Sequence, residues 1–268
     1  SANTNYNQSL ALSLGFTVLD ITGSTGNPSN TKAIVDALPS GVQALVWTGN
    51  LDNTNCATPG FTTAQFQALV AALAGDSKVF GYFLSDEPHP GVCPNAAGDI
   101  KARADYIHAH DSNQKAFIVV LDGSNQCGGN LGCEYNALQP ANSHVDLIGL
   151  DPYPCHYDTN GVAVACDNTK INTAVSNAIA NGISLSAIVP VFQTFGQLGR
   201  TDGSTVYYRT PSSSELTTML NTWAGLVPKP AMDYAYTFGV QCSASCPAPQ
   251  ALANQSALQA VIKTHNGL

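Results

Sequence analysis

The stretch that decides the fold is KVFGYFLSDEPHP, residues 78–90. Its apolar run ends at two adjacent acids, Asp86 and Glu87, and Pro88 follows them. A short, nearly continuous apolar run is typical of a strand buried on both faces of a parallel sheet. Only 10% of the 268 residues are charged, so two neighbouring carboxylates at a strand end favour the rim of an active site. A solvated acidic turn before proline is the alternative interpretation.

The same pattern, an apolar run that ends in a polar or glycine-rich loop, recurs along the chain. The predicted strands are 16–21, 42–49, 78–85, 115–121, 145–151, 186–195 and 232–239. The predicted helices are 7–15, 31–38, 63–75, 96–111, 172–182, 213–226 and 257–266. Strands that alternate with helices predict a parallel sheet covered by helices. Because the composition shows no break, we predict a single α/β domain over residues 1–268 with a (β/α)8 TIM barrel fold.

A barrel of this type has eight strands, and the pattern supplies seven. Either the first strand is missing from the chain, or residues 1–6 supply a short, atypical one. If it is missing, the run 16–21 is strand two and the run 78–85 is strand four. A doubly wound sheet is the alternative fold. It normally has a glycine-rich phosphate turn, of which LDITGSTGNPSN, residues 19–30, is only a loose imitation.

The charge balance argues against some partners. The chain has 10 Lys and Arg against 18 Asp and Glu, for a net charge of −8, and no basic run. Nucleic acid is therefore a poor candidate partner. The sequence has no run of about eighteen apolar residues, so we predict no membrane span.

Eight cysteines in polar loops predict disulfides and an oxidising, extracellular compartment. Pairing by proximity in sequence leaves two cysteines over, and these are expected to pair with each other. The predicted pairs are Cys127 with Cys133, Cys155 with Cys166, Cys242 with Cys246, and Cys56 with Cys93. Cysteines and histidines show no zinc spacing, so we expect no catalytic metal and no cofactor.

Polar and aromatic residues end several predicted strands. In a (β/α)8 barrel the active site lies at the carboxyl ends of the strands. The loop 200–214, RTDGSTVYYRTPSSS, is expected to wall one side of the cleft. Carboxylates and amides bind hydroxyl groups, and aromatic faces stack on sugar rings, so this rim predicts a carbohydrate cleft. The candidates are Asp20, Trp47, Asn50, Asp86, Glu87, Asp151, Tyr153, Gln193, Phe195 and Tyr236.

The acid pair has the chemistry that glycosidic cleavage needs. One carboxyl group must hold a proton while another carries charge. Two adjacent acids in a partly apolar site repel each other's charge, which raises one pKa. Neighbouring residues on a strand point to opposite sides, so both acids face the cleft only if the strand ends or kinks there, and Pro88 is consistent with that. We predict Glu87 as the general acid, with Asp86 tuning it or orienting the substrate.

Two motifs carry a resemblance to a known group of enzymes. DEP, residues 86–88, resembles the Asn-Glu-Pro signature of clan A glycoside hydrolases, and VDLIGLDPYP, residues 145–154, resembles the sixth strand of several of them. The resemblance implies a retaining (β/α)8 enzyme in which the acid/base Glu ends strand four. It also implies that Tyr153 supports the nucleophile. The motifs identify no family within the clan.

The chain departs from the clan at two positions. Asp86 stands where the clan has Asn, and PVFQTFG, residues 190–196, offers Gln193 where a nucleophilic Glu should end strand seven. The protein is then an engineered Glu-to-Gln variant, or it uses another acid, Asp151 or Asp86. A third interpretation is substrate assistance, as in the hexosaminidase families 20 and 123 that the acid pair resembles, where the Asp orients the acetamido group that acts as nucleophile. An inverting enzyme with Asp151 as a distant base also stays open.

We therefore predict a secreted, monomeric glycoside hydrolase that cleaves O-glycosidic bonds of a polysaccharide or oligosaccharide. A carbohydrate-binding barrel that has lost catalysis is the alternative, and a barrel enzyme for a peptide or cell-wall linkage is a third class. A second carboxylate separates the first two, because hydrolysis needs an acid within about 5–10 Å of Glu87.

Overall fold

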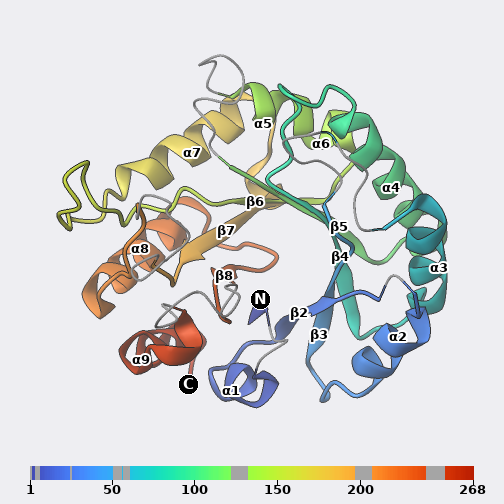
Figure 1. Ribbon diagram of the computed structural model, residues 1–268, viewed down its shortest axis with the longest axis horizontal. Coiled ribbons are helices and arrows are strands. Elements are labelled where there is room, and N and C mark those ends of the chain that lie inside the picture. Colours follow the sequence, from blue (N-terminus) through green and yellow to red (C-terminus); the bar gives the residue numbers. More distant parts are fainter. Residues whose placement is uncertain are drawn as a thin grey trace.

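The computed structural model describes residues 2–3, 7–24, 26–50, 56, 61–121, 132–196, 207–239 and 251–268. In this part of the chain eight parallel strands form one sheet, in which each strand pairs with its neighbours in chain order. Figure 1 shows the strands at the centre and the helices around them. The strands are β1 (Ala2–Asn3), β2 (Val18–Thr22), β3 (Gln43–Trp47), β4 (Val79–Asp86), β5 (Lys115–Val120), β6 (Leu147–Leu150), β7 (Ile188–Gln193) and β8 (Tyr234–Tyr236).

The strand that the sequence pattern did not supply is the first one, β1, which has two residues. Ala2 is in register with Leu19 and Asn3 with Asp20 on β2, and β1 lies beside β8. The expected alternative of a short strand within residues 1–6 is therefore confirmed, and the run that ends at Asp86 is strand four. The fold is the predicted (β/α)8 barrel, with an atypical first strand.

The helices follow local capping signals. Pro28 starts α2 three residues before the predicted start, because proline is favoured in the first helical turn. Capping boxes start α3, from Thr62 to Gln65, and α8, from Ser212 to Glu215. Two short helices, α5 and α6, were not predicted. The helices are α1 (Gln8–Ser13), α2 (Pro28–Asp36), α3 (Thr63–Leu73), α4 (Ala96–His110), α5 (Cys133–Leu138), α6 (Pro140–Ser143), α7 (Thr169–Ala180), α8 (Ser213–Leu226) and α9 (Ser256–His265).

The strands have apolar side chains on both faces, which creates two cores. Alternate residues of one strand divide between them: Ala44 and Val46 face the helices, whereas Leu45 faces the barrel interior. The interior contains close aromatic contacts, with the ring centroids of Phe83 and Phe117 4.8 Å apart. The barrel interior is therefore filled by packed side chains below the carboxyl ends of the strands.

The predicted disulfides Cys56–Cys93 and Cys155–Cys166 are confirmed. Cys133 is also disulfide-bonded. The other predicted cysteines, Cys127, Cys242 and Cys246, lie outside the described residues. Of the helices in the described part of the chain, none has the length and apolar character needed to cross a membrane.

Candidate active site

A cavity of about 260 Å³ opens where the barrel strands end. Five of the predicted site residues line it, and the remaining wall is mostly aromatic and aliphatic. Such a mixture of apolar surface and a few polar groups is typical of a binding site for a small ligand. The lining residues are Asp20, Thr22, Trp47, Phe83, Asp86, Val119, Tyr153, Val191, Tyr234 and Tyr236.

Asp20 and Tyr234 form a buried polar pair in this cavity. Asp20 alternates along β2 with Leu19 and Ile21, which pack toward the helices, so its side chain points into the barrel. The Tyr234 hydroxyl donates a hydrogen bond to Asp20 Oδ2 at 2.6 Å. Burial raises the pKa of Asp20 to about 6, although the bond from Tyr234 acts in the opposite direction. This carboxyl group therefore changes its charge in a mildly acidic solution.

Asp86 ends β4 and faces the same cavity. Its backbone N–H donates to Asn50 Oδ1 at 2.9 Å, which ties the chain after β3 to the end of β4. Asn50, a predicted substrate-binding residue, does not line the cavity and instead holds this backbone. Burial raises the pKa of Asp86 to about 7, and the negative charges of Glu87 and Asp20 raise it further. A cavity-facing carboxyl group thus keeps a proton close to neutral pH.

Glu87 breaks the strand. Its φ of 46° lies in the left-handed region, which residues other than glycine seldom adopt, and its N–H donates to the Val119 carbonyl at 3.0 Å. The alternation of β4 therefore stops at Asp86. As a result, the charges of Glu87 and Asp86 both act on the same neighbour, Asp151. Both acids can face one site only if the strand ends or kinks between them, and the strand does end at Asp86.

Asp151 follows β6 and is 1% exposed. Neither carboxyl oxygen makes a hydrogen bond of standard geometry with a described residue. Glu87 and Tyr153 nevertheless lie close enough to shift the pKa of Asp151. Burial raises the pKa of Asp151 well above its usual range, and the adjacent Glu87 carboxyl and the charge of Asp86 add to this shift. Because its pKa is raised so far, Asp151 keeps a proton next to the Glu87 carboxyl group.

Gln193 lies in the protein interior. It was predicted to act in catalysis or to bind sugar, but it is 0% exposed and does not line the cavity. Its Oε1 accepts the Cys155 N–H at 2.9 Å, and its Nε2 donates to the carbonyls of Cys155 at 2.9 Å, Phe195 at 3.3 Å and Arg209 at 2.9 Å. A carboxylate could not donate these bonds. The surroundings therefore require an amide, which argues against an engineered Glu-to-Gln change.

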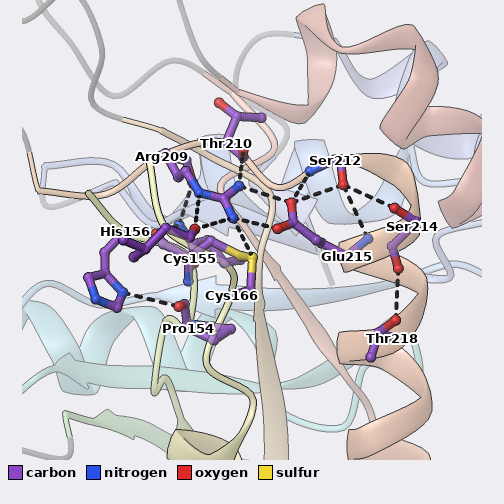
Figure 2. Close-up of a disulfide and its surroundings, with 12 residues drawn as sticks. Pro154, Cys155, His156, Cys166, Arg209, Thr210, Ser212, Ser214, Glu215 and Thr218 are labelled. Carbon is purple, nitrogen blue, oxygen red and sulfur yellow. Dashed lines mark hydrogen bonds and ion pairs between the residues drawn. A yellow bond between two sulfur atoms is a disulfide. The ribbon is translucent and has the colours of Figure 1, made fainter. Parts of the chain in front are cut away.

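The Arg209 side chain and the Cys155–Cys166 disulfide fix the same part of the backbone (Figure 2). The Arg209 guanidinium pairs with Glu215, donates to the Val164 carbonyl and lies 3.3 Å from Cys166 Sγ. The hydrogen bonds from Arg209 lower the pKa of Glu215 to about 2, so this pair stays charged. Loop 154–166, with its disulfide, is thereby joined to residues 207–210 and to α8.

Aromatic rings continue from the cavity wall. Tyr153 stacks on Tyr236, with centroids 5.6 Å apart, and meets Phe195 at 5.0 Å and Tyr208 at 5.5 Å. Phe195, predicted to bind substrate, lies behind these rings rather than in the cavity lining. Tyr234 was missed by the sequence analysis. It stands two residues before Tyr236 on β8, and strand periodicity would have placed both on the same face.

In the part of the chain that the structure describes, there is no group of three or more His, Cys, Asp and Glu side chains that could hold a metal ion. The polar groups of the cavity are mainly carboxyl and phenol groups, with the Thr22 hydroxyl and the Trp47 indole N–H, and such groups bind hydroxyl groups.

No protein-family model and no curated protein matches the sequence. The chain is similar in structure to a chitinase from Chromobacterium violaceum ATCC 12472, with 14% identity and a TM-score of 0.58 over 97% of this chain and 94% of that chain. A GH18 chitinase from Cycas revoluta in complex with (GlcNAc)3 has 13% identity and a TM-score of 0.57 over 94% and 93% of the two chains. The endo-beta-1,4-glucanase Xac0029 from Xanthomonas axonopodis pv. citri has 13% identity and a TM-score of 0.56 over 95% and 88%. At such low identity the likeness concerns the fold, and this chain therefore has a barrel of the kind that glycoside hydrolases use.

Proposed function

We propose that this protein is a glycoside hydrolase that cleaves O-glycosidic bonds of a polysaccharide or oligosaccharide, with Glu87 as its general acid. One observation carries the proposal: Asp86, Glu87 and Asp151 come together where β4 and β6 end, beside an aromatic cavity. Hydrolysis was expected to need a second acid near Glu87, and the interaction of Asp151 with Glu87 supports Asp151 as that acid. The likeness to chitinases and a glucanase supports the same reaction class.

We assign each carboxyl group a role in the reaction from its surroundings. Asp151 is buried with a raised pKa, so it holds a proton beside Glu87, the partly exposed member of the pair. Glu87 gives a proton to the glycosidic oxygen as the bond breaks. Asp86 lies in the cavity wall, where its carboxyl group orients the sugar. Asp20 and Tyr234 bind hydroxyl groups.

A sugar with a 2-acetamido group is the substrate that we favour. Gln193 leaves no acid at the end of β7, where the clan pattern has its nucleophile. In this proposal Asp86, which lines the cavity, orients an acetamido group, and that group attacks the anomeric carbon in place of a side chain. One similar chitinase was solved with (GlcNAc)3, which agrees with this choice. The disulfides support secretion, because such bonds persist in oxidising compartments. The monomeric state stays a prediction.

The test is the Glu87→Gln variant, assayed on N-acetylchito-oligosaccharides and cello-oligosaccharides with mass-spectrometric detection of products. Loss of a general acid lowers a rate by about 10²–10⁴-fold, so we expect hydrolysis to fall by that factor with the thermal unfolding midpoint retained. The matched control is Asp99→Asn, which changes an exposed acid in the first turn of α4. Normal hydrolysis by Glu87→Gln would remove Glu87 from this role. Binding without cleavage by the unmodified protein would instead support a non-catalytic barrel.

A further inference from the structure

A row of aromatic side chains leads out of the cavity. From the cavity-lining Tyr153, ring contacts continue to Tyr208 at 5.5 Å, from Tyr208 to Tyr207 at 4.9 Å, and from Tyr207 to His156, which stacks on it at 5.1 Å. We call Tyr208, Tyr207 and His156 the aromatic ridge. Tyr207 is 43% exposed, whereas most large aromatic residues of this chain are buried. The ridge thus joins the cavity to the surface.

The ridge is held in a fixed shape. His156 and Tyr208 form an antiparallel bridge, and the Tyr157 N–H donates to the Tyr207 carbonyl at 2.7 Å. Next to the bridge, the Arg209 N–H donates to the Cys155 carbonyl at 3.2 Å. The disulfide and the Arg209–Glu215 pair close the same region (Figure 2). A surface fixed before binding loses little conformational entropy when a ligand lands on it.

The cavity alone is small for a chain substrate. Pockets that enclose a drug-sized ligand measure about 300–1,000 Å³, and this cavity has about 260 Å³. If one end of an oligosaccharide is bound there, the next units must lie outside, and the ridge is an aromatic surface continuous with the cavity wall. Lys170 adds a polar group, since its Nζ lies 5.7 Å from the centre of the Tyr207 ring and 3.5 Å from the Tyr207 hydroxyl. An ammonium group beside an aromatic face offers hydrogen-bond donors to sugar hydroxyls.

We infer that the aromatic ridge is a binding subsite for further sugar units of the same chain, so that the enzyme acts on extended oligosaccharides rather than on a single terminal sugar. The inference rests on the proposed function, because the cavity must hold the unit that is cleaved. Tyr207 and His156 provide the outer platform, and Tyr208 links it to Tyr153. Affinity and turnover should therefore increase with the length of the oligosaccharide.

The experiment compares dissociation constants for N-acetylchito-oligosaccharides of two and six units, with the cello series in parallel, by titration calorimetry. An aromatic contact is worth about one factor of ten in affinity, so we expect Tyr207→Ala to weaken six-unit binding about ten-fold and to leave two-unit binding unchanged. Tyr207→Phe keeps the ring and should keep the affinity. The control is Tyr106→Ala on α4, which removes a ring that contacts Phe66 and His110 instead of the ridge.

The outcomes distinguish a failure of the proposed subsite from a failure of the proposed function. If the unmodified protein cleaves oligosaccharides but Tyr207→Ala weakens the two lengths equally, or weakens neither, the subsite is refuted while the hydrolase remains. If the unmodified protein neither binds nor cleaves any oligomer of either series, both the subsite and the proposed function fail. Loss confined to the six-unit ligand, with a retained unfolding midpoint, supports the ridge.

Discussion

Replacing Gln193 by Glu should strongly destabilise the fold. The Gln193 amide donates to the carbonyls of Cys155, Phe195 and Arg209 in a fully buried position. A carboxylate donates none of these bonds and would face carbonyl oxygens with a negative charge. An uncompensated buried charge costs about 3–5 kcal/mol, and we expect Gln193→Glu to lower the free energy of unfolding by about that amount at pH 8. Gln193→Met removes the same bonds without a charge, and leaves buried groups unpaired at a cost of about 1–3 kcal/mol.

The assay is urea unfolding, with the disulfides intact, at several pH values. Burial raises the folded-state pKa of the new carboxyl group, so the fold binds its proton more tightly than the unfolded chain does. The penalty is therefore small below the unfolded pKa of about 4.3 and grows as the pH rises through the folded-state pKa. Gln193→Met should show no such pH dependence. A Gln193→Glu protein that is as stable as the original at pH 8, and that gains hydrolytic activity, would refute the reasoning and identify this position as the clan nucleophile.

Asp20→Asn should flatten the dependence of stability on pH. The folded-state pKa of Asp20 is raised from 3.8 to about 6, so the contribution of Asp20 to stability is present at low pH and is lost as the pH rises through about 6. Urea unfolding midpoints should therefore fall less across that pH range in the variant than in the original protein. Equal dependence of the midpoint on pH in the two proteins would contradict the raised pKa. Asp86→Asn should remove any limb near pH 7 from the pH–activity profile, because the pKa of Asp86 is about 7; an unchanged limb would assign it to another group. Replacing Cys155 and Cys166 together by Ser should cost about 2–4 kcal/mol of stability, and a thermal midpoint equal to that of the original protein would show that the remaining contacts hold loop 154–166 alone.

Much of the fold could be predicted from the sequence because its strands are local and nearly continuous apolar runs. The runs at 78–85 and 115–121 became β4 and β5 with small changes at their ends. The first strand could not be predicted as firmly, because β1 has two residues and is defined by its register with Leu19 and Asp20 on β2. A pairing of this kind is a tertiary contact and leaves no periodic pattern.

The candidate site also contains residues that could be found from the sequence and residues whose contacts could not be predicted. Asp86 and Glu87 could be found because paired acids at a strand end are unusual in a chain with few charges. The hydrogen bonds of Gln193 could not be predicted, because they go to the carbonyls of Cys155 and Arg209, which are distant in sequence. Asn50 was placed near the site for its chemistry, yet its oxygen accepts the backbone N–H of Asp86. Sequence position indicated which polar residues gather at the rim, but not which of them bind ligand and which hold the backbone.

The left-handed backbone at Glu87 sets stability against activity at a single position. A residue with a side chain in such a conformation costs about 1–3 kcal/mol, and a glycine would adopt the φ of 46° with little strain. Selection for thermal tolerance alone would therefore favour glycine at position 87, and the same change would remove the proposed acid. Relatives that carry glycine at this position are expected to be more stable proteins that bind sugars without cleaving them. Among relatives, this one residue would then mark the evolutionary boundary between an enzyme and a lectin-like descendant.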